Sequence, residues 1–171
     1  MITLQMAFHD ENVADESINK SLDTILSSNT LLSMASIKDG TESWIHTAYY
    51  AYSSKLSLYY LSSPSAQHSK NVEQSQSVAV SIFDTHQNPT DKKRGVQLFG
   101  TCHRAVGGEV AEGLRLYTER FSWLANYIKE PRDFDKGTLE SKLYIITPRT
   151  IKLFDEAVFG EEKWVIIDVP Q

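Results

Sequence analysis

The chain has 171 residues, a formal net charge of -5 and 11% aromatic residues. This composition excludes a disordered chain, and the acidic balance argues against nucleic-acid binding, which needs a basic surface. No stretch approaches the ~20 consecutive apolar residues of a membrane span. The N-terminus lacks a signal-peptide pattern, and the single cysteine fits a reducing compartment. We therefore expect a cytoplasmic protein that binds a small ligand or a protein partner, with no role at nucleic acid or membrane.

Neither a repeat nor a linker divides the sequence. We expect a polar, loose segment over residues 1–14 and one domain over 15–171. Asp15 is a suitable N-cap for a helix over 16–28, whose apolar residues recur on one face. That helix should lie against a larger element.

After this helix the apolar residues alternate, which predicts β-strands. Asp39-Gly40 is a strong hairpin signal, because a type I′ turn needs positive φ at both central residues. Tight turns between successive strands imply antiparallel pairing. The expected strands cover 31–37, 43–52, 56–62, 78–83, 95–106, 143–147, 151–155 and 164–169.

Two further helices are expected, a short one over 66–74 and a longer one over 109–129. The longer helix carries apolar residues at steps of four and three, which form one continuous seam. It is therefore either a core-facing helix or a helix between its own sheet and a second subunit.

The strand over 43–52 is aromatic or apolar on both faces. An antiparallel strand covered on both sides is typical of a barrel wall with something packed outside it. A flat aromatic ligand, a partner subunit, or both would satisfy that pattern.

The segment after the third strand offers an anion site. The strand ends in hydroxyl residues, Pro64 blocks its continuation, and a short helix begins near Ala66. The N-terminus of a helix presents unpaired N–H groups and a positive dipole end, which favour a phosphate. The alternative is an ordinary capped helix with a solvated first turn. Candidate phosphate donors are Ser62, Ser63, Ser65, Gln67, His68 and Lys70.

Motifs for an activated serine, a zinc protease or a phosphate-binding P-loop are absent from the sequence, and its five histidines show no metal-ligand spacing. Gly100 lies inside a predicted strand, which often marks a bulge or the close approach of another group. Gln97, on the same strand, either contacts a ligand or makes an inter-strand hydrogen bond.

The order of elements and two segments, S-S-P-S-A-Q-H-S-K-N over 62–71 and R-G-V-Q-L-F-G-T over 94–101, give the chain a family resemblance. From Ser21 to Val169 it resembles the FMN-binding split barrels of the pyridoxamine 5'-phosphate oxidase-like superfamily, particularly their small bacterial members. The resemblance implies a mainly β (α+β) fold: an antiparallel Greek-key split β-barrel with flanking helices.

The resemblance also implies a homodimer with FMN at the subunit interface. It assigns the phosphate to Ser62, Ser63, Gln67, His68 and Lys70, and the flavin ring to Thr47, Ala48 and Gln97. Trp164 corresponds to an aromatic residue near the C-terminus that reaches toward the site.

One departure from the family is clear. Where the oxidase has an Arg-Lys pair, this chain has Gln67-His68, so a strong bidentate phosphate contact is missing. The pyridoxal phosphate segment of the true oxidase has no match either. The chain is therefore not expected to be a pyridoxamine phosphate oxidase.

The first hypothesis is an FMN-dependent oxidoreductase or flavin reductase of unidentified substrate, with NAD(P)H as the expected electron donor. The alternative is a non-catalytic split-barrel module that binds haem or another ligand, with His46 or His103 as axial ligand. A third possibility is a dimeric scaffold that has lost its cofactor.

Overall fold

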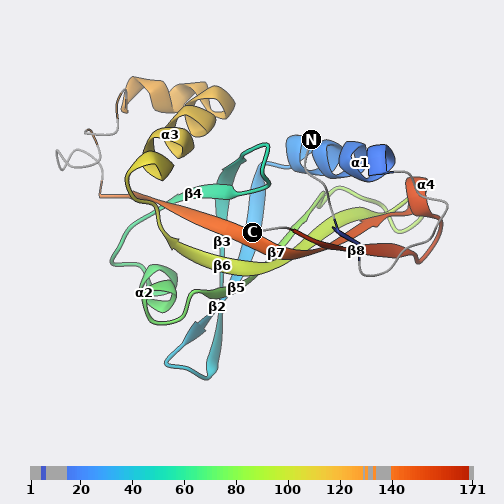
Figure 1. The fold of residues 1–171 in the computed structure, drawn as a ribbon, viewed down its shortest axis with the longest axis horizontal. Helices are drawn as coiled ribbons and strands as arrows, with labels where there is room; N and C mark the ends of the chain where they lie inside the picture. Colours follow the sequence, from blue (N-terminus) through green and yellow to red (C-terminus); the bar gives the residue numbers. More distant parts are fainter. Residues whose placement is uncertain (1–4, 7–14, 129, 131–132, 134–139, 170–171) are drawn as a thin grey trace.

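The fold is an antiparallel barrel, seen in a computed structural model that describes residues 5–6, 15–128, 130, 133 and 140–169 (Figure 1). The strands form one eight-stranded sheet in the order β1-β8-β7-β4-β3-β2-β5-β6, and a further pairing of β7 with β6 closes it. Every pairing is antiparallel, as predicted. The elements are β1 Gln5–Met6, α1 Asp15–Ser28, β2 Leu31–Lys38, β3 Glu42–Tyr52, β4 Leu58–Ser62, α2 Gln67–Gln74, β5 Ser77–Phe83, β6 Arg94–Arg104, α3 Gly108–Arg120, η1 Ser122–Asn126, β7 Lys142–Asp155, α4 Glu156–Phe159 and β8 Trp164–Asp168.

Most sequence-predicted elements occur where expected. The hairpin between β2 and β3 is confirmed, because Asp39 and Gly40 have φ of 51° and 77°. The strand expected from residue 56 begins only at Leu58, since Leu56 has a positive φ of 65° and belongs to the preceding turn. Within the segment over 1–14, Gln5 and Met6 pair with Asp168 and Ile167 of β8. The rest of that segment lies outside the described residues.

One long strand, β7, replaces the two strands predicted over 143–147 and 151–155. Its 14 residues pair with β6 along nearly their whole length. On its other edge, the first half pairs with β4 and the second half with β8. This change of partner splits the barrel and adds β8 and β1 beyond its closed part.

The two predicted strands are continuous because β6 accommodates Pro148, which lies between them. The register of β6 against β7 shifts between Phe99 and Gly100, and Gly100 then lies opposite Pro148. A bulge of this kind tolerates a residue without an N–H group. A Cβ atom at Gly100 would lie 2.1 Å from the carbonyl oxygen of Thr147, so only glycine allows this approach.

Helices α1 and α2 close the interior of the barrel. The buried α1 residues Ile18, Leu22, Ile25 and Leu26 join the same core cluster as Val72 of α2. Figure 1 shows α2 on the opposite side of β6 and β7 from α1 and α3. The interior is therefore filled from both sides by side chains.

Helix α3 covers part of the outer surface of the barrel, where it packs on Ala51, Tyr59 and Ile145 in a second apolar cluster. The single helix predicted over 109–129 is wrong. Phe121 leaves the helical region, with φ -125° and ψ 79°, and its ring packs on Tyr49 and Tyr117. The chain then continues as the short helix η1. Residue 129 lies outside the described residues.

Arg120, at the end of α3, ties this helix to α1. Its guanidinium donates hydrogen bonds to the carbonyls of Leu26, Ser27 and Asn29, and it lies 4.7 Å from the centre of the Tyr50 ring. These carbonyls are left unpaired by the end of a helix, so a cation satisfies them well. In the described part of the chain no helix has the length and apolar content needed to cross a bilayer.

The β6–β7 crossing can be tested with Gly100→Ala. We expect this variant to lose about 2 kcal/mol or more of unfolding free energy, because the new methyl group meets backbone atoms that cannot move aside. Gly108→Ala is the matched control, since a Cβ atom there has nothing within 4 Å. Urea unfolding measures both. Equal stability of the two variants would contradict the proposed role of Gly100.

Candidate functional site

The β4–α2 turn contains all five residues that the family resemblance assigns to the phosphate. Pro64 follows the last residues of β4, and α2 begins three residues later at Gln67. The N-cap residue is Ala66, whose backbone is extended and which supplies no side-chain hydrogen bond to the first turn. The first turn also contains no acidic residue. Its N–H groups are therefore open to an external acceptor.

Two of the five residues bind each other on the inner side of this turn. Ser62 Oγ lies 2.6 Å from Nε2 of His68, and Ser69 Oγ donates to Ser62 Oγ at 3.2 Å. Ser62 is buried and His68 is half-buried. The structure thus makes these two side chains an internal pair rather than two separate outward donors.

Of the other residues in the turn, one makes internal hydrogen bonds and three lie nearer the surface. Gln67 donates to Asn71 Oδ1 at 2.8 Å, and Asn71 donates to Ser36 Oγ on β2 at 3.0 Å, which fixes α2 to the barrel. Ser63 and Ser65 lie nearer the surface, with their hydroxyls 2.8 Å apart, and Lys70 is exposed. We call Ser63, Ser65, Lys70 and the first turn of α2 the anion corner.

His68 also stacks on His46 of β3. The ring centres are 3.6 Å apart and the planes differ by 7°. Neither ring nitrogen of His46 has a hydrogen-bond partner among the described residues, although both are buried. Burial, and then the nearby His68, lower the pKa of His46 to about 4, and burial lowers that of His68. The sequence proposed His46 only as a haem ligand, and this stack closes off its ring.

The residues predicted to meet the flavin ring lie on β3 and β6. Thr47 and Gln97 both point outward and are exposed, whereas Ala48 packs toward the barrel interior. Strand pairing places Thr47, Ser33, Ser81, Gln97 and Lys152 side by side in one row across β3, β2, β5, β6 and β7. We call this the polar row.

Thr47 and Gln97 are not neighbours in the polar row. Three strand spacings separate them, which is about 14 Å along the sheet. Thr47 instead shares a 3.2 Å hydrogen bond with Ser33. A single chain therefore does not bring both side chains to one edge of a flavin ring.

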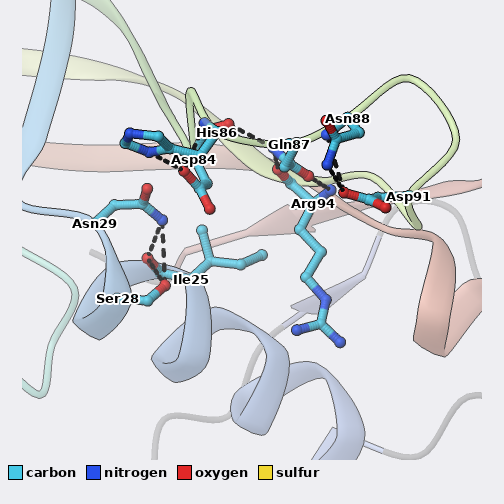
Figure 2. A network of polar contacts seen from close by, with 9 residues as sticks. All are labelled: Ile25, Ser28, Asn29, Asp84, His86, Gln87, Asn88, Asp91 and Arg94. Atoms are coloured by element: carbon cyan, nitrogen blue, oxygen red, sulfur yellow. Dashed lines mark hydrogen bonds and ion pairs between the residues drawn. The ribbon is translucent and has the colours of Figure 1, made fainter.

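A cavity of about 490 Å³ lies at the other end of the polar row. Its lining combines cationic and aromatic side chains, including Arg94, Lys152, Phe83 and Phe154. The loop between β5 and β6 forms one wall, and Figure 2 shows Gln87 bonded to the backbone of Arg94 across the base of this loop. Figure 2 also shows Asn88 bonded to Asp91, which rigidifies the loop tip.

Lys152, Phe154 and Trp164 were not predicted together. Lys152 Nζ lies 4.3 Å from the centre of the Trp164 ring, and Trp164 pairs with Phe154 across β7 and β8. The alternating side-chain directions over 151–155 indicate that Lys152 and Phe154 share a face, because they lie opposite the buried Ile151 and Leu153. That the outer side of this strand borders Gln97 depends on strand pairing, which local patterns do not indicate.

Apolar side chains surround the polar row on the outward surface of the sheet. They are exposed despite their size, and a contiguous patch of this kind marks an interaction surface. We call them the sheet-face patch: Leu31, Ile45, Tyr49, Phe83, Phe99 and Trp164.

The second haem-ligand candidate, His103, has a different environment from His46. Its Nε2 lies 3.1 Å from the carboxylate of Glu109, and the ring is partly exposed. Across the described ranges, no cluster of three or more His, Cys, Asp or Glu side chains is suited to a metal ion.

No protein-family model and no curated protein matches this sequence. Solved structures nevertheless resemble it. A heme binding protein from Mycobacterium smegmatis has a TM-score of 0.71 at 15% identity over 91% of this chain. This chain spans 60% of the length of that protein.

Two other similar structures have lengths closer to this one. A Clostridium acetobutylicum protein of the pyridoxinephosphate oxidase family, related to general stress protein 26, has a TM-score of 0.65 at 11% identity, covering 91% of this chain and 97% of its own. A FAD-binding protein from Mesorhizobium loti has a TM-score of 0.55 at 17% identity, covering 86% and 91%. The chain therefore has the split-barrel fold of pyridoxamine 5'-phosphate oxidase-like proteins, as its sequence predicted.

The His46 environment predicts acid sensitivity. Because its folded pKa of about 4 lies below the ordinary 6.5, its contribution to stability is complete above 6.5 and is lost as the pH falls toward 4. We expect His46→Phe, which keeps an aromatic ring but cannot be protonated, to lose less stability than the wild type across this window.

Urea unfolding at a series of pH values measures this difference. His86→Gln, at an exposed ring in the β5–β6 loop, is the control and should keep the wild-type pH dependence. An identical pH dependence in the His46→Phe variant and the wild type would show that His46 is not the acid-sensitive group.

Proposed function

We propose that this chain is an FMN-binding homodimer that works as a flavin-dependent oxidoreductase. The observation that carries the proposal is the anion corner, which combines an uncapped helix N-terminus, the neighbouring hydroxyls of Ser63 and Ser65, and the exposed Lys70 on the same helix. A phosphate monoester accepts several hydrogen bonds and carries negative charge, so these groups suit it. Similarity to proteins named for flavin binding or for the pyridoxinephosphate oxidase family supports the same reading.

The donor set fits the phosphate without the Arg-Lys pair of the oxidase. Ser63, Ser65, Lys70 and the first N–H groups of α2 would hold it, with Ser62 and His68 directly behind. Thr47 and the backbone beside Ala48 would meet the ring. When bound, FMN supplies the electron-transfer chemistry, and NAD(P)H is the expected electron donor. The protein contributes binding, orientation and exclusion of water, which agrees with the lack of an acid–base catalytic motif in the sequence.

The homodimer rests on the sheet-face patch. Ile45 is 71% exposed, and Tyr49, Phe83 and Phe99 are also largely exposed on the same surface of the sheet. A second copy of the chain would cover these residues. The separation of about 14 Å between Thr47 and Gln97 supports contributions from two protomers to each ring, since adjacent strands are about 4.8 Å apart.

Haem binding is the second candidate, favoured by the pairing of His103 with Glu109. A carboxylate that accepts a hydrogen bond from one imidazole N–H group orients the ring and raises the basicity of the other nitrogen. His103 is therefore a better axial ligand than His46, whose ring is stacked on His68. The similar Mycobacterium protein is named for heme binding.

Cofactor titration tests the choice between FMN and haem. Purified protein is mixed with FMN or with hemin, and visible spectra and flavin fluorescence are recorded. Saturable quenching by FMN supports the proposal, whereas a Soret band with hemin and no flavin binding supports the alternative. A protein that binds neither would be a scaffold without a cofactor.

Lys70→Ala should weaken FMN binding by about 1–3 kcal/mol, because a hydrogen bond to a charged group is lost. Riboflavin, which lacks the phosphate, should bind wild type and variant equally. Lys20→Ala on the exposed side of α1 is the matched control. Unchanged FMN affinity in Lys70→Ala would remove this residue from the site.

Ile45→Glu should convert the dimer to a monomer, since it buries an unpaired carboxylate in the proposed interface. Sedimentation equilibrium measures the mass. Val106→Glu, at another exposed apolar residue before α3, should leave the dimer intact. A wild-type protein that is monomeric at all concentrations would contradict the homodimer directly.

A further inference from the structure

A glycine separates two phenylalanines in the cavity at the end of the polar row. Strand pairing places Phe83 of β5, Gly95 of β6 and Phe154 of β7 next to one another on the outward face of the sheet, and all three line the cavity. The three atoms nearest to a Cβ at Gly95 would all belong to Ile82 and Phe83 of β5, which leaves the space toward Phe154 open. The cavity therefore contains a slot above Gly95 with a phenyl group on each side.

The width of this slot suits a planar aromatic ring. Phe83 and Phe154 lie two strand spacings apart, which is about 10 Å. A ring standing on edge above Gly95 would have its centre about 5 Å from each phenyl group. Aromatic pairs prefer centre-to-centre distances of about 4.5–7 Å, so both contacts would be favourable. The cavity volume of about 490 Å³ lies within the range of about 300–1,000 Å³ that is usual for small-molecule pockets.

Polar side chains border the slot along one edge. Two residues further along the same three strands, Ser81, Gln97 and Lys152 form the next outward row, and they also line the cavity. Within the described part of the chain, none of these three side chains forms a hydrogen bond or an ion pair with another residue. Their polar groups are therefore available to a ligand whose ring occupies the slot.

Lys152 supplies a positive charge that no carboxylate of the described residues neutralises. Its Nζ lies 4.3 Å from the centre of the Trp164 ring, and an ammonium has three N–H groups, so donors remain for a second contact. The other two cations of the lining, Lys93 and Arg94, each form an ion pair with a buried carboxylate at the end of β7 or the start of α4. An anionic group at this edge would therefore bind to Lys152.

The β5–β6 loop forms another wall of the cavity and is held in place by its own hydrogen bonds. Gln87 accepts a hydrogen bond from the backbone N–H of Arg94 at 2.6 Å and donates one to the Arg94 carbonyl at 3.0 Å (Figure 2). Asp84 is the one acidic residue among the described residues that line the cavity, and it accepts a hydrogen bond from the backbone N–H of His86 at 2.8 Å. This wall is therefore preformed, and its carboxylate is already bonded within the loop.

We infer that this cavity binds a planar aromatic carboxylate, with the ring above Gly95 between Phe83 and Phe154 and the carboxylate on Lys152. The amide of Gln97, on the neighbouring strand, would donate a second hydrogen bond to the carboxylate. The inference goes beyond the proposed function and does not depend on flavin binding, because it uses only groups that line this cavity. In the proposed homodimer the second copy would border the cavity, since Phe83 also belongs to the sheet-face patch.

The test is isothermal titration calorimetry of the full-length protein with 2-naphthoate, a flat aromatic carboxylate, and with 2-naphthalenemethanol, its uncharged counterpart. We expect naphthoate to bind saturably and about tenfold more tightly than the alcohol, because it forms a hydrogen bond between charged groups. Lys152→Gln should weaken naphthoate binding about tenfold and leave the alcohol unchanged. Phe154→Leu should weaken both compounds several-fold. Lys55→Gln, at an exposed lysine between β3 and β4, is the matched control and should bind as wild type.

A wild-type protein that binds neither compound would overturn the inference, and this result does not depend on the folding of any variant. Affinity for the alcohol equal to or above that for naphthoate would overturn it as well. So would equal naphthoate affinity in Lys152→Gln and Lys55→Gln, because Lys152 would then not hold the carboxylate. Unchanged binding in Phe154→Leu would contradict the slot. The FMN titration is a separate measurement, so either binding can fail while the other is observed.

Discussion

The close approach of β6 and β7 at Gly100 is the constraint on which the rest of the architecture depends. Pro148 cannot donate a hydrogen bond and Gly100 has no side chain, so the two strands pass each other with a shift of register. This lets β7 continue as one strand while its other edge exchanges β4 for β8. Barrel closure and the extra strands beyond it both follow from that exchange.

The two faces of strand β3 have different roles. Its inward residues, such as His46 and Tyr50, hold the helices that close the interior, through the stack on His68 and the hydrogen bond from Tyr50 to α1. Its outward residues, such as Thr47 and Tyr49, remain exposed around the polar row. The anion corner follows the end of β4, and its His68 stacks on His46 of β3.

Two buried carboxylates, Asp155 and Glu156, stabilise the chain beside the cavity at the end of the polar row. Asp155 is almost fully buried and accepts hydrogen bonds from Ser21 at 2.7 Å and from Arg94 at 3.2 Å. Its neighbour Glu156 accepts from the backbone of Lys93 and of Glu162. These bonds connect α1, the start of β6 and α4. A buried carboxylate is tolerated only when it is paired in this way, so the end of β7 is firmly anchored beside the cavity.

The sequence alone determined the local elements, because alternation, helical periodicity and the Asp39-Gly40 turn are properties of neighbouring residues. It also located the β4–α2 turn, and family resemblance supplied the split barrel. Tertiary structure decided everything that depends on distant residues: that β7 runs through Pro148 opposite Gly100, that Phe121 breaks the third helix, and that the polar row separates Thr47 from Gln97. It also turned Ser62 and His68 toward each other and stacked His68 on His46. Such pairings are set by packing between strands and helices far apart in the chain, and local patterns do not record them.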